Sequence, residues 1–173
     1  GPAAILSTPA GTLTASASTG INLTTPTNNV SGVVALNTAT GGIAYSAAGT
    51  IQLGAVTGPA AVGIVSTGGS ILDGNGASPN ISAGTLLLNA ATGIGSAGAP
   101  LDVATTTSID AQSVGGSIYL ASAGTMPLGV ISAPATVSLA SSGGSINDAN
   151  GVSPNISAGT AVLSAYSGIG FGN

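Results

Sequence analysis

The side chains able to do acid–base or metal chemistry near neutral pH are four aspartates, because Lys, Arg, His, Glu and Cys are all absent. Polysaccharide lyases and glycosidases need paired carboxylates, or a carboxylate beside a cation. Asp102 and Asp110 would form such a pair if they lay on adjacent strands. A Ser-His-Asp or Cys-His nucleophile is excluded by composition. We therefore expect no enzymatic activity, no catalytic residue and no cofactor.

The other two aspartates stand in matching loops, Asp73-Gly74-Asn75-Gly76 and Asp148-Ala149-Asn150-Gly151. Each loop resembles half of an oxygen-ligand calcium loop, but calcium takes six to eight oxygens and no Glu follows. Asp and Asn before Gly also form ordinary Asx-turns, which would make both loops matching corners of a rod. The sequence leaves the choice open and assigns no metal ligand.

Threonine pairs give a third chemical hypothesis. A flat Thr ladder on a β-solenoid can order water, which would make the chain an ice- or surface-binding module. Against this, the ladder stops early, and Thr-rich strands are common on exposed sheet faces. The Thr-x-Thr pairs are Thr12/Thr14, Thr25/Thr27 and Thr38/Thr40, and later Thr105/Thr107.

Glycosylation triplets and aromatic residues carry little weight. Chance explains the triplets that begin at Asn22, Asn29, Asn80 and Asn155 in a chain so rich in Asn, Ser and Thr. An aromatic carbohydrate platform needs clustered rings, so we expect the few aromatics to pack in the interior or at edges. They are Tyr45, Tyr119, Tyr166 and Phe171.

Composition excludes several partner classes. The formal net charge is −4 and no basic residue is present, so we expect no nucleic-acid binding and no attraction to anionic lipid. No apolar run approaches the ~20 residues of a membrane helix, and no signal peptide is visible. Zero cysteine does not decide the compartment. Residues 1–2, Gly-Pro, are typical of a tag-cleavage remnant and are set aside, which leaves 3–173 as one domain.

Short alternating runs of branched aliphatic and small polar residues predict an all-β chain with essentially no helix. Examples are Ile21-Asn22-Leu23-Thr24, Val34-Ala35-Leu36-Asn37 and Ile118-Tyr119-Leu120. Candidate strands recur roughly every 8 to 10 residues, from Ile5 to Ile169, each entered through a Gly, Ser, Asn or Thr turn signal. This spacing permits an antiparallel sandwich or a parallel solenoid.

An internal repeat favours the solenoid. Residues 41–98 align with 116–173 at a constant offset of 75, and Ser78-Pro79-Asn80-Ile81 returns as Ser153-Pro154-Asn155-Ile156. Asn-Gly, the usual hairpin signal, occurs only inside the two aspartate loops. We therefore predict a parallel β-solenoid of about nine coils of roughly 19 residues. Each repeat would span about four coils, and the shared segment would return at the same azimuth.

One cadence resembles a known family. Gly69-Ser70-Ile71-Leu72-Asp73-Gly74-Asn75-Gly76, then Ile81-Ser82-Ala83-Gly84-Thr85, then Thr92-Gly93-Ile94-Gly95 are similar to the repeat tracts of filamentous-haemagglutinin-like exoproteins. These are the bacterial surface adhesins of two-partner secretion systems and related autotransporter passengers. The resemblance implies a right-handed parallel β-helix, secretion to the bacterial cell surface, and a stalk or adhesive role.

From these observations we expect a non-catalytic rod, a spacer of a secreted adhesin or fibre. The alternatives are a self-assembling extracellular fibre or sheath subunit, and an ice- or surface-binding solenoid. The expected partners are neighbouring repeats or like subunits end to end, since uncharged end strands invite pairing. The sequence names no host or surface ligand.

Overall fold

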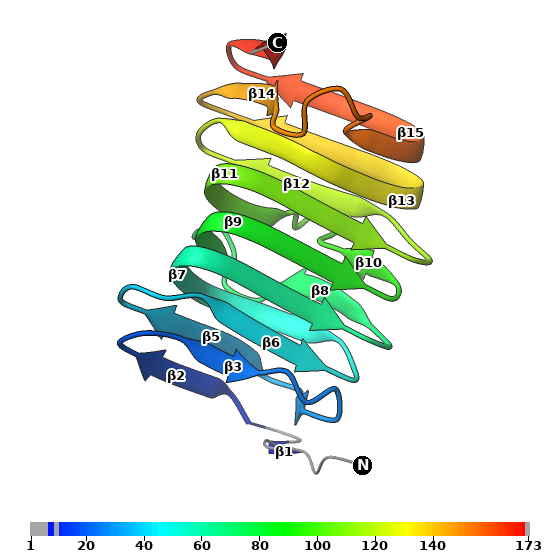
Figure 1. The fold of residues 1–173 in the computed structure, drawn as a ribbon. Helices are drawn as coiled ribbons and strands as arrows, with labels where there is room; N and C mark the ends of the chain where they lie inside the picture. The colour runs from blue at the N-terminus through cyan, green and yellow to red at the C-terminus, as the bar shows by residue number, and fades with distance from the viewer. Residues whose placement is uncertain (1–6, 9–10, 172–173) are drawn as a thin grey trace.

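The computed structural model describes residues 7–8 and 11–171, so Gly1, Pro2 and the strand expected near Ile5 lie outside the described residues. The described chain is a parallel β-solenoid of about 7 turns. Near strands run from left to right as the chain climbs toward its C-terminus, which makes the coil right-handed (Figure 1). The described residues contain no helix, and hence none that could cross a membrane.

Sixteen strands alternate with turns of Gly, Ser, Asn and Thr. They are β1 Ser7–Thr8, β2 Leu13–Ala17, β3 Ile21–Leu23, β4 Asn29–Val30, β5 Val33–Thr38, β6 Ile43–Ala47, β7 Ile51–Ser66, β8 Ser70–Asp73, β9 Ile81–Ala90, β10 Gly93–Ile94, β11 Leu101–Ser113, β12 Ile118–Ser122, β13 Met126–Ser141, β14 Ser145–Asp148, β15 Ile156–Ala165 and β16 Gly168–Phe171.

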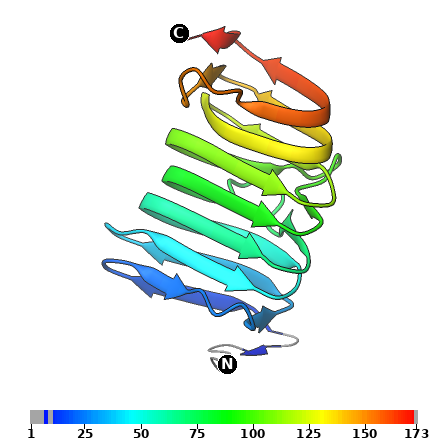
Figure 2. The same ribbon diagram turned by 45° about the vertical axis from the view of Figure 1, so that its right-hand side comes forward.

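Each coil has three faces, because a long strand bends twice while keeping parallel partners. In β7, Ile51 pairs with Ile71 of β8, while Val56 pairs with Ile81 at the start of β9. After a register shift, β7 and β9 pair again over their last residues. Figure 2 shows these strands stacked one above another along the rod.

The coils are longer and fewer than the sequence predicts. The register advances by 19 residues from Val34 to Leu53, but by 25 from Val56 to Ile81. The longer coils contain the loop between β8 and β9, which residues 74–80 form. The expected nine coils of roughly 19 residues were therefore wrong: loops inside the coils consume residues that add no rung.

The repeat also does not return at the same azimuth. Three pairings lead from Ile51 through Ile71 and Ile94 to Ile118, which is 67 residues along the chain. The counterpart of Ile51 lies at Met126, on the following face. A 75-residue unit is thus three turns plus one face, not four turns.

The two copies of the Ser-Pro-Asn-Ile segment consequently stack on different columns. Ile81 lies between Val56 and Val103, whereas its counterpart Ile156 lies on Ile131. Because both columns are aliphatic, the same segment fits either one. The expectation of a single returning corner was wrong for this reason.

The interior is a continuous aliphatic core. Inward positions alternate with outward ones along each strand, as in the burial of Val33–Thr38 and Ile118–Ser122. Ile, Leu and Val of successive coils stack directly on one another, and 0–3% of most of these side chains is exposed. Tyr45 is the large exception in chemistry, being fully buried among them.

A small hydroxyl closes several corners at the end of a strand. Ser66 Oγ accepts a hydrogen bond from the Gly69 N–H at 3.0 Å and donates to the Gly49 carbonyl at 2.8 Å. Ser141 repeats this arrangement with Gly144 and Gly124. The serine thus supplies both a donor and an acceptor where the strand ladder stops.

Candidate functional site

Asn80 is the central side chain of the first aspartate loop, and it is fully buried. Its Nδ2 donates to the Leu53 carbonyl, to Asp73 Oδ1 and to Asn75 Oδ1, at 2.9, 2.9 and 2.6 Å. Its Oδ1 accepts from the Asp102 N–H at 2.8 Å. Asn80 therefore links three successive coils, and this burial leaves no room for a glycan on its amide.

Asp73 is engaged by donors rather than turned toward a cation. Its Oδ1 also accepts from the backbone N–H groups of Asn75 and Gly76, at 2.9 and 3.0 Å. Burial works to raise the pKa of Asp73, but the bonds from Asn80, Asn75 and Gly76 outweigh it, so this pKa lies below its usual value. The geometry is that of an Asx-turn.

The second aspartate loop repeats the first. Asn155 Nδ2 donates to the Leu128 carbonyl and to Asp148 Oδ1, at 2.8 and 2.9 Å. Asp148 Oδ1 accepts from the Asn150 N–H at 2.8 Å. Within the described residues, no group of three His, Cys, Asp or Glu could hold a metal ion. A calcium titration followed by melting still tests the calcium hypothesis directly.

Asp102 and Asp110 do not form an adjacent-strand pair. Both lie on β11, on different faces of the coil. Burial, followed by the charge of Asp73, raises the pKa of Asp102. Asp110 instead accepts a hydrogen bond from the Val130 N–H at 2.8 Å. The two carboxylates thus have separate structural surroundings.

The threonine ladder is not formed. Thr14 pairs with Ala35, and Thr38 is buried and pairs with Ala17. Thr25 lies in the turn region between β3 and β4. The 13-residue spacing differs from the coil length, so the threonines fall on different faces.

The largest cavity is a cleft of about 600 Å³ on the side of the rod. Residues within 77–83, 102–106 and 122–127 line it, together with Asn147. β11 pairs with β12 at Leu101 and Asp102, and with β13 again from Ile109. Between these points β11 is bordered by the turn that joins β12 to β13, and this break in the ladder forms the cleft.

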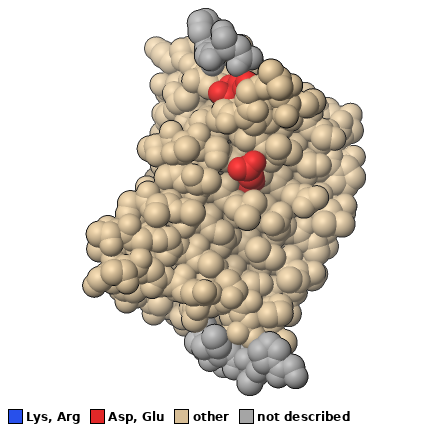
Figure 3. All heavy atoms as spheres, viewed as in Figure 1, with Lys and Arg blue, Asp and Glu red and all other residues tan. Residues whose placement is uncertain are grey.

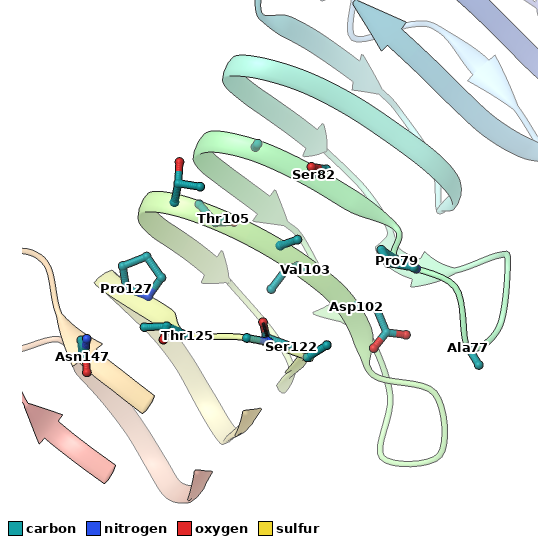
Figure 4. A pocket seen from close by; sticks show the side chains of 15 residues that line it. Ala77, Pro79, Ser82, Asp102, Val103, Thr105, Ser122, Thr125, Pro127 and Asn147 are labelled. Atoms are coloured by element: carbon teal, nitrogen blue, oxygen red, sulfur yellow. Dashed lines mark hydrogen bonds between the residues drawn. The ribbon is translucent and has the colours of Figure 1, made fainter. Parts of the chain in front are cut away.

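Figure 4 shows that the cleft is elongated, with Asp102 and Pro79 toward one end and Asn147 and Pro127 toward the other. Ser82, Ser122 and Thr125 add hydroxyl groups to its lining. The surface carries no basic side chain to oppose these groups, and Figure 3 shows two acidic spots on the face that it displays. The cleft therefore offers oxygen acceptors beside small apolar side chains.

No protein-family model, curated protein or solved structure matches this chain. The fold thus rests on the pairing of its own strands.

Sequence reasoning singled out Asp102 but missed the two cleft residues Thr105 and Asn147 as partners for it. Thr105 was considered only as part of a ladder. A signal was present in the repeat, since both positions differ between its two copies. That signal became legible only once the coil register was known.

Proposed function

We propose that this chain is a rigid spacer segment of a secreted bacterial surface adhesin. The observation that carries the proposal is the uninterrupted parallel stack, in which each coil of the described chain pairs with its neighbours along a single axis. Such an array transmits length and stiffness, and contacts between neighbouring coils supply its stability. At one rung per strand spacing, the described coils span roughly 30 Å.

The composition supports a role outside the cell. The absence of Lys and Arg removes every trypsin-type cleavage site. The polar groups at the corners are satisfied internally, as with Asn80 and Ser66. A rod of this kind resists proteases through its sequence as well as its fold.

The test is where the chain is found and in what length. Antibodies raised against the purified chain should label intact cells of the producing bacterium, and an immunoblot should show one polypeptide much longer than 15.8 kDa. Labelling that requires permeabilised cells would overturn the proposal.

The second candidate is a self-assembling fibre subunit. The observation that favours it is the terminal coil, where half of the Val162 and Ile169 side chains is exposed. In that case the same immunoblot would show a short species that enters fibres, rather than one long chain.

A further inference from the structure

Two polar atoms in the wall of the cleft have no hydrogen-bond partner although they are buried. They are Thr105 Oγ1 and Asn147 Oδ1. The whole Thr105 side chain is only 8% exposed. A buried oxygen left without a partner costs stability, so neither atom is explained by folding.

The repeat sharpens this point, because its first copy has aliphatic residues at both positions. Thr105 precedes Ile109 by four residues, as Val30 precedes Val34. Ile109 and Val34 are equivalent, since they pair with Leu128 and Leu53.

Asn147 corresponds in the same way to Leu72. Asn147 pairs with Pro127 of β13, and Leu72 pairs with the equivalent residue of β7, Gln52. The fold is therefore built with Val and Leu in one copy, whereas the other copy places unpaired oxygens around a cavity.

Asp102 adds a third acceptor at the opposite end from Asn147 (Figure 4). Its backbone N–H is already bonded to Asn80, which holds that stretch of β11 in place. Carboxylate and amide oxygens accept hydrogen bonds, and a threonine hydroxyl both accepts and donates. The cleft thus calls for an elongated ligand with several hydroxyl donors.

We propose that this cleft binds a short neutral oligosaccharide. The sugar hydroxyls donate to Asp102 and Asn147 and exchange a hydrogen bond with Thr105, while C–H faces pack against Pro79 and Pro127. A cavity of about 600 Å³ is within the range of small-molecule sites. The proposal stands on the cleft itself and does not depend on the spacer role.

Other ligand chemistries fit less well. A cation needs converging ligands, but Asp102 and Asn147 lie at opposite ends of the cleft. An anionic sugar would meet the Asp102 carboxylate with no basic residue in the chain to balance it. Neutral hydroxyl donors match all three acceptors.

The test uses the whole chain with maltotriose, cellotriose and N,N′,N″-triacetylchitotriose as probes. Saturation-transfer NMR and titration calorimetry should detect binding of at least one of them. Thr105→Val and Asn147→Leu each install the residue of the first copy, and each should weaken that binding at least about tenfold. Their melting temperatures should stay unchanged or rise by about 2–4 °C.

Thr107→Val is the matched control, since Thr107 is exposed on the same strand and does not line the cleft. It should leave binding unchanged. The proposal is overturned if no probe binds, or if Thr105→Val and Asn147→Leu bind as tightly as the unaltered chain. It is equally overturned if a Ser/Thr-rich peptide binds at this cleft and the sugars do not. Failure here leaves the cell-surface labelling test of the spacer unaffected.

Discussion

At the scale of single residues, the interior contains one side chain that does not match its surroundings. Tyr45 is buried among aliphatic residues, and its hydroxyl has no hydrogen-bond partner. Tyr45→Phe removes that hydroxyl and should raise the free energy of unfolding by about 1–2 kcal/mol. Thermal melts measure this, with the exposed Tyr166→Phe as a control that changes little.

The same hydroxyl predicts a pH dependence. Burial raises the pKa of Tyr45 above 10.0, its usual value. The folded chain therefore holds this proton more tightly than the unfolded chain, and stability falls as the pH rises above about 10. Tyr45→Phe should reduce that alkaline loss; an identical loss in the variant would contradict the assignment.

Asp73 and Asp102 should respond to acid in opposite directions. The pKa of Asp73 is lowered on folding, so its stabilisation is present above about pH 4 and is lost as the pH falls through the folded pKa. Asp102 has a raised pKa, so its ionisation costs stability at neutral pH. Melts at pH 7 should show Asp73→Asn less stable and Asp102→Asn more stable than the parent chain. If both variants lost stability at pH 7, the assignment for Asp102 would be wrong.

At the scale of elements, a β-bulge in β13 depends on one carboxylate. Gly129 and Val130 both lie opposite Asp110, because the register passes from Leu128 directly to Ile131. Asp110 accepts the Val130 N–H, and a Cβ on Gly129 would collide with its carboxylate. Asp110→Ala should cost about 0.5–1.5 kcal/mol and speed hydrogen exchange of the Val130 amide.

The first copy of the repeat provides the reciprocal control for that bulge. Ala35 stands there in place of Asp110, opposite Gly54. Ala35→Asp should slow exchange of the Ala55 amide, which is equivalent to Val130. Unchanged exchange at both amides would show that the carboxylate does not hold the bulge.

At the scale of the whole molecule, the last coil is the place where association is expected. Within the described part of the chain β15 pairs with β13 alone, and Leu163 is only partly buried on its inner side. Leu163→Lys should prevent end-to-end stacking, because its charge could reach water only while no further coil covers it. Light scattering at high concentration should show oligomers of the parent chain and monomers of the variant.

Val114→Lys is the control for association, since Val114 is 72% exposed on the side of the rod. It should associate as the parent does. A parent chain that stays monomeric at every concentration would contradict the prediction and weaken the fibre alternative.

The sequence alone determined the local structure and the principle of stacking. Period-2 alternation specifies strands because successive side chains point to opposite faces, and Gly, Ser and Asn specify where those strands turn. The 75-residue repeat specifies that one unit packs on another. These are short-range or pattern-level facts, which need no knowledge of which residues lie opposite each other.

Tertiary structure alone decided the coil length, the azimuth and the cleft. How many residues a loop such as 74–80 takes within a coil depends on Asn80 bonding to Leu53 and Asp102, which are far away in sequence. Register then decides that Thr105 and Asn147 face one cavity. No local pattern contains that juxtaposition, because it results from summing unequal coil lengths along the rod.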